Sequence, residues 1–527
     1  MLLCFCSIVH GQISTREEPV SFRTNLQDIT KSERTQKIFP PLDMLEIEKE
    51  NEEDLTKGLS RFAYRYEVNF NLENSGEWIV LSNGERIWRL SIYCPEALSI
   101  NLLYDKFWIP DGAKFFIYNK ERTHSIGAFT SRNNKGTRDN LRGFSTGLVF
   151  GDQITLEYYL PIEVQETGVI SISHVSHGYK YFGFPEKMQR SNYGNSGPCQ
   201  VNINCIEGQD YQDKKNAVAL IIFFGCIIAD GALINNTAND FTPYFWTSEN
   251  FLSRELMFAG HDVYNAVFYW HYESSGCASL IEPPSFSTSG AIIVASDPVS
   301  DYALLLLDEN PIDDGVVPYF LGWDRSSNPV NGGVSIHHPK GDIKKISTYN
   351  ITPTTTNCLD FTFPWGCMCG SHYYRSNDFW RINWVQTVNG FSIPEDESQG
   401  SPLLNSKGRV IGQLFKYSNC RNYGCDSPAH NHNNYGKFSH SWPGVERWLD
   451  PINSGVLVLD GISPCFTNFS NRNVTTNLSI MGCNNLSVEN VTITNNAKLK
   501  LEASGTITIE GNFEAISGTE LEVFNIQ

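Results

Sequence analysis

Positive charge is scarce in this sequence. Its 527 residues include 40 Lys and Arg against 58 Asp and Glu, which gives a formal net charge of -18. A chain with this balance repels nucleic acid and anionic lipid, so we expect neither as a partner. Long apolar runs are also missing after the N-terminus. Without a run of about 20 apolar residues, no membrane span is expected.

The N-terminus lacks the basic residues that open a secretory signal, although it is otherwise short and apolar. Residues 1–11 resemble the end of such a signal, and cleavage is expected near Gly11–Gln12. The alternative is a disordered start of a cytosolic protein. We expect the chain to be secreted and therefore extracellular.

The cysteine count agrees with secretion. Two of the 14 Cys, Cys4 and Cys6, fall in the segment expected to be removed, and an even number remains. An even count in a secreted chain favours disulfides. A zinc site is the competing interpretation for Cys358, Cys367 and Cys369. Only His372 stands at a spacing that would complete such a site, so we expect no metal and no organic cofactor.

A chain of this length is expected to form several domains. Short alternating segments between Gly and Asn turns predict a mainly β protein. The expected divisions are a signal remnant at 1–11, a linker at 12–59, a β-sandwich at 60–180, a second linker at 181–197, a domain at 198–462 and a tail at 463–527. The first linker contains an acidic run at 46–54, which is expected to be solvated.

The tail carries short strands at near-regular spacing. They are predicted at 485–493, 497–502, 506–510 and 520–524. Rungs of this kind, separated by Asn or Gly, favour a small β-solenoid or stalk, and a β-sandwich is the alternative. A disulfide between Cys465 and Cys483 would staple the first turn of the tail.

Residues 395–403 read Glu-Asp-Glu-Ser-Gln-Gly-Ser-Pro-Leu, which is a serine-protease nucleophile loop without its nucleophile. In trypsin-like proteases the loop reads Gly-x-Ser-Gly-Ser/Gly-Pro, and its first Ser attacks the substrate carbonyl. Gln399 takes that place here, followed by Gly400, Ser401 and Pro402. An amide side chain is not a nucleophile, and it has no proton that a His base removes.

Longer stretches in a fixed order support the comparison. They lie at 194–205, 232–240, 242–245, 322–326, 336–345, 406–414 and 435–439. Together they resemble the lysyl endopeptidase branch of secreted trypsin-like serine proteases, in the form common in Bacteroidetes-type bacteria. The resemblance implies a propeptide-like sandwich, a protease-type domain of two six-stranded antiparallel barrels, and a C-terminal tail.

The resemblance also assigns the catalytic positions, and most of them are altered. Asn250 stands at the position of the general-base His, and an amide cannot take and return a proton near neutral pH. Asp301 keeps the position of the acid that orients the base. Glu397 replaces the Gly whose N–H helps to line the oxyanion hole, at a place that favours Gly for its backbone conformation. Gly400 of the same loop is retained.

The specificity pocket and one disulfide differ from the family as well. Asn433 replaces the acid that attracts substrate Lys, and Phe415 replaces a His. One family disulfide is missing at both ends, where Ala229 and Phe251 stand. The disulfides that the resemblance implies are Cys205–Cys277 and Cys199–Cys425, with Cys420 as the competing partner of Cys199.

These losses predict a secreted pseudoprotease, which is an inactive and monomeric homologue. Its former cleft, near Asn250, Gln399, Phe415 and Asn433, is expected to bind a peptide or protein ligand by strand pairing. One alternative is an active serine endopeptidase that uses displaced residues, with Ser398 or Ser401 as nucleophile and a remote His, or with rescue by Glu249 or His261. The other alternative is a surface adhesin that merely carries the inactive domain.

Overall fold

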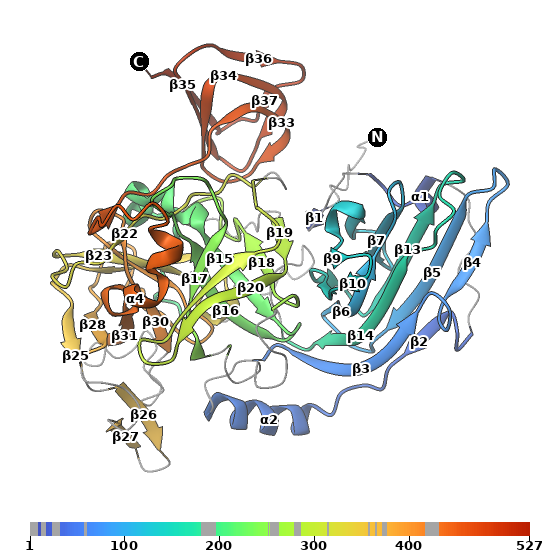
Figure 1. Ribbon diagram of the computed structural model, residues 1–527, viewed down its shortest axis with the longest axis horizontal. Coiled ribbons are helices and arrows are strands. Elements are labelled where there is room, and N and C mark those ends of the chain that lie inside the picture. Colours follow the sequence, from blue (N-terminus) through green and yellow to red (C-terminus); the bar gives the residue numbers. More distant parts are fainter. Residues whose placement is uncertain are drawn as a thin grey trace.

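The computed structural model describes residues 9–11, 17–23, 32–56, 61–180, 196–250, 252, 263–278, 286–312, 316–356, 359–363, 366–370, 377–416 and 432–526. The described chain is mainly β, as the sequence predicts, and Figure 1 shows three parts. An N-terminal part in blue and teal lies beside a central part in green to orange, and a red C-terminal part extends from the central one.

Two sheets form the N-terminal part and share one core. The first contains β1 (Val9–Gly11), β2 (Gln36–Ile38), β4 (Glu77–Val80), β5 (Arg86–Tyr93), β7 (Lys114–Asn119), β8 (His124–Phe129) and β13 (Gln153–Leu160). The second contains β3 (Ala63–Asn71), β6 (Ser99–Trp108), β11 (Phe144–Ser145), β12 (Val149–Phe150) and β14 (Val169–Gly178). Leu90 and Leu156 of the first sheet pack with Leu102 and Ile172 of the second, because alternate residues of each strand face the partner sheet.

The segment at 12–59, expected to be a linker, contains regular structure. Strand β2 pairs in parallel with β5, and α2 (Met44–Thr56) takes up the acidic run. The short helix α1 (Val20–Arg23) is held where the Ser21 N–H donates to buried Glu157 at 3.1 Å. Sequence patterning missed these elements because an isolated edge strand or a polar helix leaves little periodic signal.

Two larger sheets form the central part. The seven-stranded sheet contains β15 (Val218–Phe223), β16 (Ile227–Leu233), β17 (Tyr244–Thr247), β18 (Val267–Trp270), β19 (Phe286–Ser289), β20 (Ala291–Asp297) and β21 (Tyr302–Leu307). The nine-stranded sheet contains β22 (Trp323–Asp324), β23 (Gly333–His337), β24 (Lys345–Tyr349), β25 (Thr354–Thr356), β28 (Phe379–Asn383), β29 (Pro402–Asn405), β30 (Val410–Lys416), β31 (His432–Lys437) and β32 (Val458–Leu459). Both are mainly antiparallel, and they exceed the six strands per barrel that the resemblance implied.

Smaller elements complete the first two parts. They are β9 (Gly136–Thr137), β10 (Asn140–Leu141), β26 (Leu359–Phe363), β27 (Gly366–Gly370), η1 (Ser131–Asn133), η2 (Ile206–Tyr211), η3 (Lys214–Ala217), η4 (Pro339–Gly341) and α4 (Phe438–Leu449). The sequence at 441–450 predicts one short helix, and α4 overlaps it. Its Phe438, Trp442 and Val445 are buried in the central core, which places the helix against the sheets.

The tail stacks its strands in parallel. It contains β33 (Phe466–Val474), β34 (Leu478–Ile493), β35 (Lys498–Ala503), β36 (Ile507–Glu510), β37 (Glu514–Ala515) and β38 (Glu520–Asn525). Leu478 pairs with Leu499, and Leu499 pairs in turn with Leu521. Because apolar residues of successive strands stack on one another, the tail has its own apolar core, where Ile480 and Leu501 are fully buried.

Two predicted disulfides are confirmed. Cys205 is bonded to Cys277, and Cys465 to Cys483. Cys199 is disulfide-bonded as well, and both of its candidate partners, Cys420 and Cys425, lie outside the described residues. Disulfides of this kind fit an extracellular compartment.

The N-terminal part is tied to the central part by buried charge and by backbone pairing. Lys135 and Glu309 lie 2.7 Å apart with side chains only 4% and 10% exposed, and Arg142 meets Asp308 at 3.2 Å. The Phe62 N–H donates to the carbonyl of Cys226 at 3.0 Å. The sandwich is therefore packed onto the central sheets as part of one structure.

Candidate active site

Strand pairing brings the base and acid positions together. Asn250 follows β17, and Asp301 immediately precedes β21. These two strands are antiparallel neighbours, with Thr247 opposite Ala303. The ends that carry the two residues therefore lie side by side, although 51 positions separate them along the chain.

Asp301 is buried, at 1% exposure, and two donors reach its carboxylate. The backbone N–H of Asn250 donates to Oδ1 at 2.8 Å, and the Ser248 hydroxyl donates to Oδ2 at 2.7 Å. Burial raises the pKa of Asp301 well above its ordinary range, although the hydrogen bond from Ser248 acts in the opposite direction. The carboxylate of Asp301 is thus satisfied by a hydroxyl and a backbone amide.

Gln399 is joined to this acid through Ser248. Its Nε2 donates to the Ser248 Oγ at 3.2 Å, so that one hydroxyl links the nucleophile position to the acid. The backbone carbonyl of Gln399 accepts the Asp230 N–H at 2.7 Å, which anchors the loop on β16. Only 8% of Gln399 is exposed. The amide therefore belongs to a hydrogen-bonded chain and is not a loose surface side chain.

The nucleophile loop has a backbone conformation that requires glycine-like freedom at two places. Gly400 has φ +88°, and a Cβ there would lie 2.2 Å from the carbonyl oxygen of Asp230. Glu397 has φ +71° although it is not glycine. A left-handed conformation costs an ordinary residue roughly 1–2 kcal/mol. The loop thus has a left-handed residue where the resemblance expects Gly, and Glu397 is strained there.

Replacement of Glu397 by Gly tests that strain. We expect Glu397→Gly to raise the free energy of unfolding by about 0.5–1 kcal/mol, because the relief of strain exceeds the entropy that Gly gains when unfolded. Urea denaturation followed by circular dichroism measures the change. Lys407→Gly, in an exposed turn at ordinary φ, is the matched control and should lower stability. A decrease in the free energy of unfolding of both variants would contradict the strained conformation of Glu397.

The two serines that flank Gln399 are both fully buried. The Ser398 hydroxyl lies 3.0 Å from His337 Nδ1, and His337 Nε2 lies 2.8 Å from the Ser347 hydroxyl. Burial holds the pKa of His337 well below its ordinary value, so that the ring stays neutral. Ser401 also has a hydroxyl neighbour, Ser335, at 3.5 Å. Neither serine is exposed at the surface in this arrangement.

A buried Asp–His pair directly behind the loop was missed by the sequence analysis. His338 Nδ1 lies 2.6 Å from Asp230 Oδ1, and the His338 backbone N–H donates to Oδ2 at 2.6 Å. Burial raises the pKa of Asp230, and the neighbouring His338 opposes that rise. The adjacent His pair in 336–345 was a signal, but its partner lies 108 residues away. No local pattern would have paired them.

The N-terminal edge of the central part docks against the same loop. The Gly197 N–H donates to Glu395 Oε2 at 2.8 Å, and Lys340 Nζ lies 3.4 Å from the other carboxylate oxygen. Burial raises the pKa of the next residue, Asp396, to about 6. Two segments distant in sequence thus contact residues 395–396.

The former specificity positions are occupied by internal contacts. The Trp384 indole N–H donates to Asn433 Oδ1 at 2.6 Å, and Asn433 is 4% exposed. Phe415 is 3% exposed and packs edge-on against Phe379 at 5.2 Å between ring centroids. An uncharged, hydrogen-bonded amide provides no ionic attraction for a lysine side chain. Nothing in these contacts selects a cation.

Other proposed site residues fall outside the described chain. Phe251, His261, Cys358 and His372 cannot be placed, whereas Ala229 is buried in β16. Among the described residues, His, Cys, Asp and Glu form no cluster suited to a metal ion. No helix in the described ranges is long and apolar enough to cross a bilayer.

A buried ion network supports the seven-stranded sheet and the nine-stranded sheet at once. Glu273 lies 2.5 Å from Lys215 Nζ and 3.4 Å from Lys344 Nζ, and all three side chains are fully buried. The two lysines hold the pKa of Glu273 at about 2 despite its burial. Charges in such surroundings must stay paired, because unpaired buried ions are very costly.

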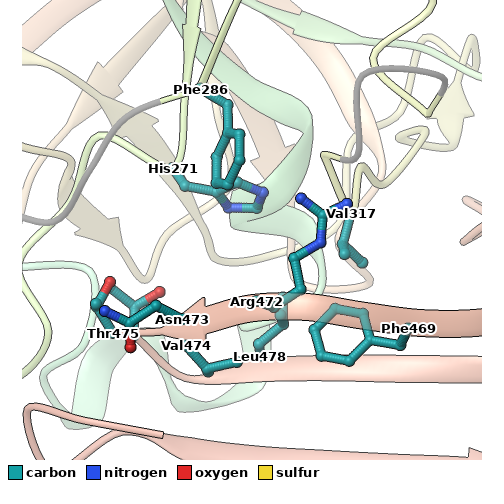
Figure 2. Close-up of a pocket in the computed structure, with 10 residues that line it drawn as sticks. His271, Phe286, Val317, Phe469, Arg472, Asn473, Val474, Thr475 and Leu478 are labelled. Atoms are coloured by element: carbon teal, nitrogen blue, oxygen red, sulfur yellow. The ribbon is translucent and has the colours of Figure 1, made fainter. Parts of the chain in front are cut away.

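The contact between the central part and the tail encloses a small pocket (Figure 2). His271 and Phe286 come from the central part, and Phe469 and Arg472 come from β33 of the tail. The Arg472 guanidinium lies 5.8 Å from the centre of the Phe286 ring, and burial lowers the pKa of His271 to about 3. The tail is thus packed against the central part through rings and one guanidinium.

The paired strands, the buried acid and the loop at 395–403 lie in the part of the chain that is similar to trypsin-like serine endopeptidases. Residues 193–436 match the family model described as "Lysyl endopeptidase, C-terminal domain". This part of the chain is therefore similar to the lysyl endopeptidase family, in agreement with the resemblance seen in the sequence.

A known relative is similar over more than half of the chain. A lysyl endopeptidase from Pseudomonas aeruginosa is 26% identical over 335 residues, covering 59% of this chain and 64% of the relative. The chain thus spans less than two thirds of that relative. Among solved structures, an inactive form of Rv3671c protease is 13% identical, covers 47% of this chain and 96% of its own, and has a TM-score of 0.28. A Glu endopeptidase is 15% identical, covers 44% and 90%, and has a TM-score of 0.25. Scores this low add no argument.

Proposed function

We propose that this chain is a secreted, catalytically inactive homologue of lysyl endopeptidase that binds a peptide or protein in the former substrate cleft. The hydrogen bond from Gln399 to Ser248 is the observation that carries the proposal. The nucleophile position holds an amide, the base position holds another amide, and the remaining acid is satisfied by its neighbours. Acyl transfer needs a nucleophile at the first of these positions and a base at the second. The amide of Gln399 is not a nucleophile, and the amide of Asn250 is not a base.

An active endopeptidase that uses displaced residues is the second candidate, because Ser398 does meet a histidine. Three observations weigh against it. Both partners are fully buried, the other nitrogen of His337 faces a hydroxyl and not a carboxylate, and the ring is held neutral. The pair fits a structural hydrogen bond better than a catalytic dyad.

The ligand class follows from the sheets that surround the site. Exposed edges of antiparallel sheets bind extended peptides through main-chain hydrogen bonds, which do not depend on any catalytic group. The altered pocket at Asn433 removes the preference for Lys, so the binding proposed here is broad in side-chain identity. We further propose that the protein is a monomer and that the sandwich stays attached to the central sheets. Its N-terminal segment is proposed to direct export.

Peptide binding and peptide cleavage are measured on the same sample. A library of unfolded polypeptides labelled with a fluorophore is expected to bind with dissociation constants near the micromolar range and to remain intact by mass spectrometry. Asn250→Trp, which places a bulky ring at the base position, should weaken binding about tenfold or more, whereas Lys407→Ala should not. Cleaved peptides would overturn the inactive assignment, and equal binding by both variants would place the ligand elsewhere. Binding of glycans by the sandwich alone would instead favour an adhesin.

A further inference from the structure

The last strand of the tail, β38, leaves the end of an apolar column uncovered. Leu499 and Leu501 of β35 are fully buried, and they pair in register with Leu521 and Val523 of β38. The two residues of β38 continue the same column, yet they are 36% and 49% exposed. In stacked repeats the terminal unit ordinarily has a polar outer face, because no further unit covers it. The apolar end of this tail is therefore suited to contact with another strand.

The outer edge of β38 also has main-chain groups that no strand pairs with. Among the described strands, β38 pairs with β35 alone. The Glu520 N–H donates to the Ala497 carbonyl at 3.1 Å, so Glu520 and every second residue after it face β35. Successive residues of a parallel strand direct their main-chain groups to opposite edges. The N–H and C=O groups of Leu521 and Val523 therefore point to the open edge, where they can pair with an added strand.

The charged side chains of β38 indicate which charge an added strand would carry. Nζ of Lys498 lies 2.6 Å from Glu522 and 3.5 Å from Glu520, so that one ammonium group serves two carboxylates. The Glu520 side chain is 68% exposed. Lys500 does not supply the second positive charge, because its Nζ lies 2.7 Å from Glu502 of its own strand. Opposite charges on neighbouring strands attract and like charges repel, so this edge favours a basic strand.

We infer that the open edge of β38 binds an extended segment of a partner polypeptide in which basic and apolar side chains alternate. The segment adds as one more parallel strand, like the strand pairs within the tail. Its apolar side chains cover Leu521 and Val523, and its basic side chains lie beside Glu520 and Glu522. Strand β35 has the same pattern on the other side of β38, where residues 498–501 read Lys-Leu-Lys-Leu. The inference is independent of whether the former cleft binds peptide.

Fluorescence anisotropy of synthetic peptides with the full chain tests this binding. The first peptide, Lys-Leu-Lys-Val-Lys-Leu with an amidated end and a rhodamine label, carries the alternating pattern. The second has the same residues in the order Lys-Lys-Lys-Leu-Leu-Val, and the third has Glu in place of each Lys. We expect the first peptide to bind about tenfold more tightly than either control. Equal binding of the three peptides, or no binding of the first, would overturn the inference.

Two variants locate the peptide on β38. Val523→Pro blocks the open edge and breaks no bond to β35, because the N–H that proline lacks points away from that strand. It should weaken binding about tenfold, whereas Val388→Pro, at an exposed position of the central part, should not. Glu520→Lys should weaken binding about threefold, whereas Glu166→Lys, which makes the same charge change on the sandwich, should not. Circular dichroism and the melting temperature establish that the variants remain folded, and equal affinity in all four would overturn the inference.

Two further measurements separate this edge from other occupants and other sites. Analytical ultracentrifugation of the natural chain is expected to show a monomer across the concentrations of the binding assay. Self-association that Val523→Pro abolishes would overturn the inference in favour of a second copy of the chain. Asn250→Trp, which alters the former cleft, should bind the first peptide as the natural protein does. A loss of binding in that variant would place the peptide in the former cleft and would also overturn the inference.

Discussion

A fluorophosphonate probe is expected to leave the natural protein unmodified and to label a double variant, Asn250→His with Gln399→Ser, at position 399. The reason is that the site retains much of what a restored pair requires. Asp301 already accepts the backbone N–H of residue 250 at 2.8 Å, and the loop keeps φ +71° at Glu397 and φ +88° at Gly400. Triad groups act as a unit and together account for rate factors of about 10⁶. We expect labelling at least 10³-fold faster than background, read as added mass on the intact protein.

Single variants provide the controls for this experiment. Asn250→His alone supplies a base without a nucleophile, and Gln399→Ser alone supplies a hydroxyl without a base. Neither should label measurably above the natural protein. Probe mass on the natural protein would contradict the assignment, and peptide mapping would then name Ser398 or Ser401 as the displaced nucleophile. A folded double variant that does not react would show that the acid and the loop are not in working positions.

Glu273→Ala is expected to lower the free energy of unfolding by about 3–5 kcal/mol, because it leaves two buried ammonium groups without their carboxylate. Lys215 and Lys344 are both fully buried beside Glu273. A loss of this size is a large fraction of the stability of an ordinary domain, which is about 5–15 kcal/mol. Urea denaturation at neutral pH measures it. Glu166→Gln removes an exposed partner of Arg138 and should cost less than about 1 kcal/mol.

The same network sets a pH dependence of known sign. The folded protein lowers the pKa of Glu273 from 4.5 to about 2, so folding favours the ionised carboxylate. Its stabilisation is complete above pH 4.5 and is lost as the pH falls toward 2. The natural protein should therefore lose stability across this window more steeply than Glu273→Ala does. The free energy of unfolding of both proteins is measured as the pH is lowered. An equal loss of stability in the two proteins would contradict the network.

Local patterns predicted much of the fold. Alternating strands of the N-terminal sandwich, the helix Phe438–Leu449 and the Cys465–Cys483 staple all depend on residues near one another in sequence. Short strands that pair with segments distant in sequence were harder to predict. Strand β2 is only three residues long, and its parallel partner β5 begins 50 residues beyond it along the chain. Its position depends on the edge that the sandwich presents, which no window of sequence contains.

The candidate site divides in the same way. That the side chains of Asn250 and Gln399 are neither a base nor a nucleophile follows from residue identity alone, because no conformation changes the chemistry of an amide. The resemblance also assigns Asp301 to the acid position, which stays a prediction. Tertiary structure decided which donors reach that acid, that Ser398 is buried against His337, and that Asp230 meets His338. Side-chain chemistry is a property of each residue, whereas burial and partnership depend on segments that meet only when the chain folds.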